Sequence, residues 1–175
     1  MSETEPQTLI RPERAADFEA IHAVQAAAFE TDAEARLVGA LRERAEPYLS
    51  LVAEVDGAVR GHVTFSPVTL RGAPAPLLMG LAPLAVDAGV RCRGLGAELS
   101  RAGLRRCRAL GAVGAVVLGD PRYYARFGFR DAAAWNLTSV YDVPTGAFQA
   151  VELQPGAFAQ LRGTLEYHPA FSELN

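Results

Sequence analysis

Two glycines one residue apart follow an apolar run in the middle of this 175-residue chain. The run Leu81 to Val86 is typical of a buried strand, and a short turn connects it to the loop Arg91-Cys92-Arg93-Gly94-Leu95-Gly96 and a long helical pattern. Glycines at this spacing let the backbone approach a ligand and turn its N–H groups the same way. The next helix begins with unpaired N–H donors and the positive end of a dipole. This order of elements predicts a site for an anion, most often a phosphate.

The same loop also matches the start of the dinucleotide fingerprint Gly-x-Gly-x-x-Gly. Asp120, after the next strand, even stands where that motif has its ribose-binding acid. Two features oppose this interpretation. Leu99 occupies the third glycine position, and seven residues separate Val86 from Gly94, where the motif has a tight turn. A dinucleotide-dependent oxidoreductase is therefore the disfavoured alternative.

Composition excludes several classes of protein. The net charge of −3 gives no support for binding nucleic acid or an anionic membrane. Every basic residue is Arg, so a mechanism that needs a Schiff-base or Walker-type lysine is excluded. Cys92 and Cys107 show no metal-ligand spacing and no disulfide framework. No signal peptide or membrane-span pattern is found, and we expect a cytoplasmic location with no metal site.

The first half of the chain predicts two helices followed by a hairpin. A short strand over Thr8–Arg11 precedes a helix over Ala15–Phe29. Thr31 and Glu34 have capping-box spacing and are expected to begin a second helix. That helix has one apolar face, made of Leu37, Val38, Leu41 and Ala45. Asp56-Gly57 predicts a tight turn between strands over Ser50–Val55 and Val59–Leu70, the latter with Val63 and Phe65 inward.

A strand, a helix and a second strand follow as a predicted βαβ unit. The strands cover Leu77–Val86 and Ala112–Leu118, and the continuous apolar run of the second indicates a buried, parallel strand. The helix extends from Gly94 to Leu110 and ends at Gly111. Its apolar stripe is Leu95, Leu99, Gly103, Cys107 and Leu110.

The last third of the chain is less regular. Asp120-Pro121 predicts the beginning of a short helix, and a strand begins at Phe129. Further strands are predicted over Gln149–Leu153 and Thr164–His168. Residues 1–7 are expected to be flexible and residues 8–175 to form one domain.

At these motifs the sequence resembles the GNAT superfamily of N-acetyltransferases. The glycine loop fits the family signature Gln/Arg-x-x-Gly-x-Gly/Ala, and Tyr123-Tyr124-Ala125-Arg126-Phe127-Gly128-Phe129 resembles its Tyr-x-x-x-Gly-Phe. The order of predicted elements agrees over nearly the whole chain. The longer motif Gly-Asp-Pro-x-Tyr-Tyr-x-Arg-Phe-Gly-Phe is similar to one bacterial branch of that family, whose substrates are mostly unassigned.

The resemblance implies a mixed α/β fold: a central, mostly antiparallel sheet, splayed at the cofactor site, with helices on both faces. It implies acetyl-coenzyme A as cofactor, with the pyrophosphate on the backbone amides of the glycine loop. It also implies that the pantetheine arm lies along the preceding strand. The implied cofactor-binding residues are Leu84, Ala85, Val86, Arg91, Cys92, Arg93, Gly94, Leu95, Gly96 and Ala97.

The resemblance also implies direct transfer of the acetyl group to an amine, with Tyr124 protonating the departing thiolate. Two departures from the family pattern matter. Val117 stands where the family often has Asn, and the strand before the loop lacks the Glu that often acts as base. The general base stays open among His62, Glu34, Glu54 and a water molecule.

The acceptor also stays open, as a small-molecule or a protein amine. Its specificity is expected from residues 29–38, 66–76 and 132–146, which carry no decodable motif. A non-catalytic acyl-CoA-binding module is the alternative function, although Tyr124 favours an enzyme. The oligomeric state is not determined by the sequence, although homodimers are common in such families.

Overall fold

A sheet with strand order β1-β2-β3-β4-β5-β8-β6 is the framework of the residues that the computed structural model describes, 4–91 and 93–174. In chain order the strands are β1 (Thr8–Pro12), β2 (Leu49–Val55), β3 (Ala58–Leu70), β4 (Leu78–Val86), β5 (Gly114–Leu118), β6 (Arg130–Asp131), β7 (Leu137–Ser139), β8 (Phe148–Glu152) and β9 (Gly163–Glu166). Along this path β4 and β5 pair in parallel and the other neighbours are antiparallel. The predicted mostly antiparallel sheet is confirmed.

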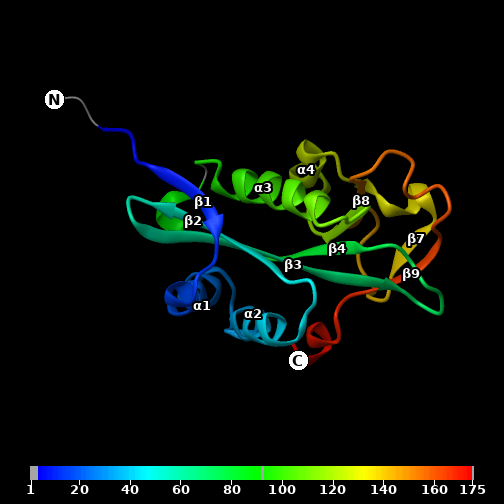
Figure 1. Ribbon diagram of the computed structural model, residues 1–175, viewed down its shortest axis with the longest axis horizontal. Coiled ribbons are helices and arrows are strands. Elements are labelled where there is room, and N and C mark those ends of the chain that lie inside the picture. The colour runs from blue at the N-terminus through cyan, green and yellow to red at the C-terminus, as the bar shows by residue number, and fades with distance from the viewer. Residues whose placement is uncertain (1–3, 92, 175) are drawn as a thin grey trace.

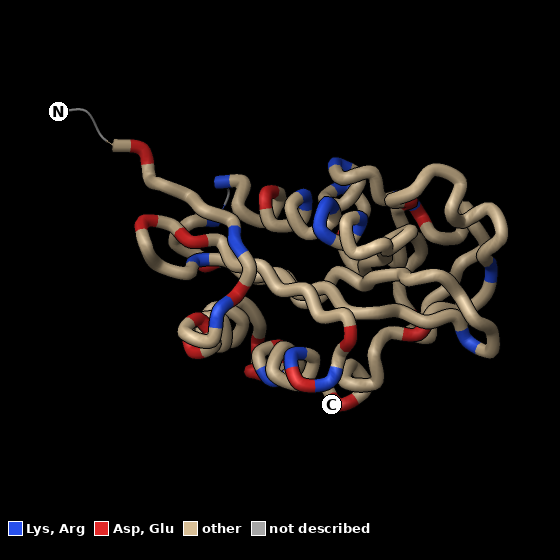
Figure 2. The backbone as a smooth tube through the Cα atoms, in the orientation of Figure 1, with Lys and Arg blue, Asp and Glu red and all other residues tan. Residues whose placement is uncertain are grey.

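Helices cover both faces of the sheet, as predicted (Figure 1). On one face lie α1 (Phe18–Ala28) and α2 (Ala33–Arg44), and on the other α3 (Leu95–Ala109) and the short α4 (Pro121–Tyr124). Short 3₁₀ helices are η1 (Ala15–Asp17), η2 (Ala88–Val90), η3 (Ala125–Phe127), η4 (Ala132–Trp135) and η5 (Pro169–Glu173). No helix in the described ranges is long and apolar enough to cross a bilayer. Charged residues gather on helices and loops, away from the centre of the sheet (Figure 2).

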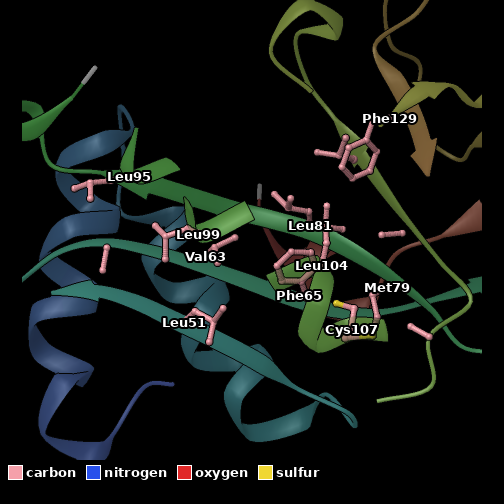
Figure 3. Close-up of a cluster of buried hydrophobic side chains, with 14 of the residues drawn as sticks. Leu51, Val63, Phe65, Met79, Leu81, Leu95, Leu99, Leu104, Cys107 and Phe129 are labelled. Carbon is pink, nitrogen blue, oxygen red and sulfur yellow. The ribbon is translucent and has the colours of Figure 1, made fainter. Parts of the chain in front are cut away.

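Alternating side chains on the strands build a separate core on each face. Val63 and Phe65 of β3 pack with Leu99 and Cys107 of α3, as the periodicity predicts (Figure 3). Leu110, predicted to continue the buried stripe of α3, is instead 50% exposed, because the helix ends there. On the opposite face the predicted apolar residues of α2 are buried.

β4 and β5 separate along their length. Their parallel pairing covers Leu78–Gly80 on β4 and Gly114–Val116 on β5 and then stops. β4 continues to Val86, held on its other edge by β3, so its remaining backbone groups on the β5 side pair with no strand of the described residues. This separation is the splay that the family resemblance implies.

The predicted capping box at Thr31 and Glu34 is wrong. The N-cap of α2 is Asp32, and the hydroxyl of Thr31 accepts a hydrogen bond from the N–H of Ala33 at 3.2 Å. Glu34 is consequently in the first turn of α2 and is not used as a cap. The carboxylate of Glu34 therefore has no capping function in α2.

The C-terminal elements also differ from prediction. β9 ends at Glu166, earlier than the predicted strand, because His168 and Pro169 begin η5. The Nδ1 atom of His168 accepts a hydrogen bond from the N–H of Ala170 at 3.0 Å, which caps this turn. The turn then packs against α2 through Phe171 in the core below the sheet.

Gly103 of α3 lies against the ring of Phe65, where an added Cβ would be 2.1 Å from Cε2. We expect Gly103→Ala to lower the free energy of unfolding by about 1–3 kcal/mol in urea denaturation, because the close-packed ring has to move. The matched control is Gly39→Ala in α2, where no atom lies within 4 Å. It should raise that free energy by up to about 1 kcal/mol through helix propensity. Equal effects of the two substitutions would contradict this account.

Candidate functional site

A cleft of about 680 Å³ lies between the end of β4 and the beginning of α3. We call it the β4–α3 cleft. Eight of the ten residues predicted to bind the cofactor line it: Leu84, Ala85, Val86, Arg91, Gly94, Leu95, Gly96 and Ala97. Arg93 does not line it, and Cys92 lies outside the described residues. Ala28, Phe29, Tyr123 and Arg126 complete its walls, which the sequence did not predict.

The beginning of α3 supplies hydrogen-bond donors to this cleft. Gly94 is the N-cap, with a left-handed φ of 80° that favours glycine, and its carbonyl accepts the first helical bond from Glu98 at 3.0 Å. The N–H groups of Leu95, Gly96 and Ala97 therefore have no partner within the helix. Because these three residues line the cleft, a bound anion would meet their amides and the positive end of the helix dipole.

Side-chain charge in the cleft is positive. Arg91 and Arg126 line it, and no carboxylate does among the described residues. Arg91 is anchored by Nε, which donates to the carbonyl of Val86 at 3.2 Å. The guanidinium of Arg126 lies 4.6 Å from the centre of the Tyr123 ring. The cleft therefore suits a ligand that carries phosphate groups.

A second cavity of about 300 Å³ lies where β4 and β5 separate. We call it the β4–β5 pocket. It shares Phe29 and Leu84 with the β4–α3 cleft, so the two spaces adjoin. Its other walls are Glu34, Leu37, Leu81, Ala82, Pro83, Leu118, Tyr124, Phe171 and Leu174.

Tyr124 belongs to the β4–β5 pocket, whereas Tyr123 belongs to the cleft. The ring of Tyr124 packs edge-on against Phe129 at 5.7 Å and passes over Gly119, where an added Cβ would lie 2.5 Å from the ring. Burial raises the pKa of Tyr124 to about 12. The phenol therefore stays protonated at neutral pH and can donate a hydrogen bond.

The three side chains considered as general base lie in different places, and only one of them lines either space. His62 is fully buried below the sheet, with Nδ1 2.8 Å from Nε2 of Gln25 and Nε2 2.7 Å from Oγ of Ser50. Glu54 accepts a hydrogen bond from Arg11 at 2.7 Å on the β1–β2 side of the sheet. Neither lines either space, whereas Glu34 lines the β4–β5 pocket together with Tyr124.

Some residues that line the cleft and the pocket are not marked by any motif in the sequence. Residues 29–38 were expected to contact an acceptor, and Phe29, Glu34 and Leu37 do line the pocket. Phe171 and Leu174 come from a turn far along the chain, which no motif marks. Tyr123 packs edge-on against Tyr124 and also lines the cleft. No cluster of metal-ligating side chains is found in the described residues.

Comparisons with a family model and with known proteins and structures agree on one family. The model of the "Acetyltransferase (GNAT) family" matches residues 13–129. The uncharacterized N-acetyltransferase YhbS of Escherichia coli strain K12 is 42% identical over 167 residues, 95% of this chain and 99% of that protein. A crystal structure of E. coli YhbS in complex with CoA superposes with a TM-score of 0.90 at 39% identity, covering 98% of this chain and 96% of that chain. A Brucella melitensis GNAT family acetyltransferase in complex with acetyl-CoA has a TM-score of 0.77 at 37% identity, covering 94% and 98%.

The burial of His62 predicts a pH dependence of stability. Burial lowers the pKa of His62 from 6.5 to about 4, so the unfolded chain binds the proton first as the pH falls. The free energy of unfolding should therefore decrease by about 3 kcal/mol from this group as the pH falls from about 6.5 to about 4. The measurement is urea denaturation across this range.

The His62→Gln variant should lose this part of the pH dependence, whatever its stability at neutral pH. His22→Gln, at an exposed position of α1, is the control and should keep it. An unchanged pH dependence in His62→Gln would contradict the assignment.

Proposed function

We propose that this chain, which belongs to the GNAT family of acetyltransferases, transfers an acetyl group from acetyl-CoA directly to an amine. The acetyl-CoA and the amine are bound at the same time. The observation that carries this proposal is the junction of the two spaces at Phe29 and Leu84. One space suits a phosphate-bearing ligand, and the other contains a protonated phenol and a carboxylate. A cofactor in the cleft would therefore present its reactive end beside Tyr124.

The residues of the cleft fit acetyl-CoA. The amides of Leu95, Gly96 and Ala97 would bind the pyrophosphate, with Arg91 and Arg126 adding positive charge. The unpaired edge of β4 over Leu84–Val86 would hydrogen-bond the pantetheine amides as an added strand does. Contacts from Arg93 and Cys92 remain predictions of the sequence.

Bound acetyl-CoA supplies a thioester whose carbonyl carbon forms a bond to the amine nitrogen while the C–S bond breaks. A backbone N–H of Ala85 or Val86 would stabilise the negative charge that develops on the carbonyl oxygen. Tyr124 would donate a proton to the departing sulfur. The ammonium loses two protons overall, the thiolate gains one, and one is released. Holding both reactants at the junction supplies most of the rate.

The environment of Tyr124 suits a hydrogen-bond donor. Its pKa of about 12 lies above the ~8.5 of an ordinary thiol, so full proton transfer is unfavourable in water. Burial also makes a thiolate at this place more basic, which narrows the difference. We extend the proposal in three respects. The acceptor is a small-molecule or protein amine, the chain forms a homodimer, and it acts in the cytoplasm.

We expect Tyr124→Phe to lower kcat by about 10²–10⁴-fold because the departing sulfur loses its proton donor. The KM for acetyl-CoA should change little, since Tyr124 does not line the cleft. The assay measures free CoA thiol released from acetyl-CoA in the presence of a panel of primary amines.

Tyr123→Phe is the matched control, because Tyr123 lines the cleft and its hydroxyl lies beside Gly96. It should affect binding of the cofactor more than kcat. If Tyr124→Phe keeps full turnover, Tyr124 has no part in the chemistry. If the wild-type chain releases no CoA with any amine, the proposed transfer is wrong.

A further inference from the structure

The side chains that line the β4–β5 pocket are mostly apolar. Leu, Ala, Pro and Phe side chains make up its walls except at two places, Glu34 and Tyr124. Apolar side chains stabilise the apolar part of a ligand that is buried against them. These side chains therefore favour an acceptor with an apolar body.

Glu34 has an unused acceptor atom in this pocket. Its Oε2 is buried and has no hydrogen-bond partner among the described residues. The carboxylate is not used as a helix cap, and no arginine pairs with it in the described part of the chain. Leaving a buried acceptor unpaired is costly. A ligand that brings a donor, above all an ammonium group, would satisfy it.

The η5 segment supplies part of the pocket wall. Phe171 and Leu174 come from this turn, which lies beside α2 (Figure 1). Arg44 of α2 binds both carboxylate oxygens of Glu173, at 3.0 and 2.8 Å. The volume of about 300 Å³ suits a small molecule.

The pocket lies next to the cleft that is proposed to bind acetyl-CoA. It adjoins the cleft at Phe29 and Leu84, and Tyr124 forms part of its wall. An amine that binds Glu34 therefore lies in the same pocket as Tyr124. The acetyl group of a cofactor in the cleft is expected at this junction, and not at the amides of α3, which line the cleft alone.

We propose that the β4–β5 pocket binds a small primary amine carried on an aliphatic or aromatic group, and that Glu34 binds its ammonium and takes its proton. This inference rests on the proposed function. The first proton passes from nitrogen to the Glu34 carboxylate, which leaves the lone pair free to attack the acetyl carbon. Glu34 is partly exposed and returns that proton to water.

The need for such a group follows from the amine itself. An alkylamine with a pKa near ~10.4 is less than about 0.1% neutral at pH 7. A carboxylate in contact with the ammonium supplies both an ion pair and a proton acceptor.

The first experiment compares 2-phenylethylamine with glucosamine as acceptors for the full chain with acetyl-CoA. Both carry one primary amine, but only the first has an apolar body. We expect kcat/KM to be about 10- to 100-fold higher for 2-phenylethylamine, the factor that corresponds to burying one phenyl group.

The second experiment uses variants. Glu34→Gln keeps the shape of the side chain and should lower kcat/KM for 2-phenylethylamine by about 100-fold or more, with the KM for acetyl-CoA unchanged. Glu43→Gln, at an exposed position of the same helix, is the matched control and should behave as the wild type. Leu174→Trp should narrow the pocket and raise the KM for 2-phenylethylamine without affecting acetyl-CoA.

Two results would overturn the inference and leave the proposed function intact. One is a preference for glucosamine over 2-phenylethylamine, and the other is full activity of Glu34→Gln. Failure to acetylate any amine, together with failure to bind CoA, would contradict the proposed function and this inference with it.

Discussion

The limited pairing between β4 and β5 is the constraint on which the rest of this structure depends. Backbone N–H and C=O groups need partners, and in a sheet the neighbouring strand supplies them. Here the parallel pairing ends at Gly80 and Val116, while β4 continues along β3 to Val86. The groups left over along one edge of β4 are available to a ligand that has amides of its own. The same separation makes room for the β4–β5 pocket.

Both spaces are positioned by elements that reach the separated strands from opposite faces of the sheet. α3 brings its unpaired amides to the end of β4 from one face, and α2 brings Glu34 to the pocket from the other. Tyr124 follows β5 on α4 and reaches the pocket from the far side of the opening. The residues proposed to carry the reaction thus lie around the end of one strand.

Local patterns predicted the βαβ unit and the glycine loop well, because each depends on residues close together in the chain. The apolar run of β5, the hairpin turn at Asp56-Gly57 and the first turn of α3 are examples. The beginning of α2 was predicted wrongly. Thr31 and Glu34 had the spacing of a capping box, but Asp32 took the N-cap position. Spacing alone cannot decide between neighbouring capping residues.

Long-range placement was the part that no pattern could supply. His62 has the right chemistry for a base, yet the alternation of β3 turns it into the buried layer beneath α1. Phe171 and Leu174 reach the pocket only because η5 folds back onto α2. The residues predicted to bind the cofactor lie in one stretch of the chain, 84–97, and could be found from the sequence, whereas the walls of the pocket come from four separate segments.

The most direct test of the account is thermal unfolding of the full chain with CoA, acetyl-CoA, NADH and NADPH added separately. A ligand at 100 times its Kd should raise the free energy of unfolding by about 2.7 kcal/mol. The account predicts a clear increase in Tm with CoA and acetyl-CoA and none with NADH or NADPH. No increase with either CoA form would contradict it, because the glycine loop and the open edge of β4 would then bind no such cofactor.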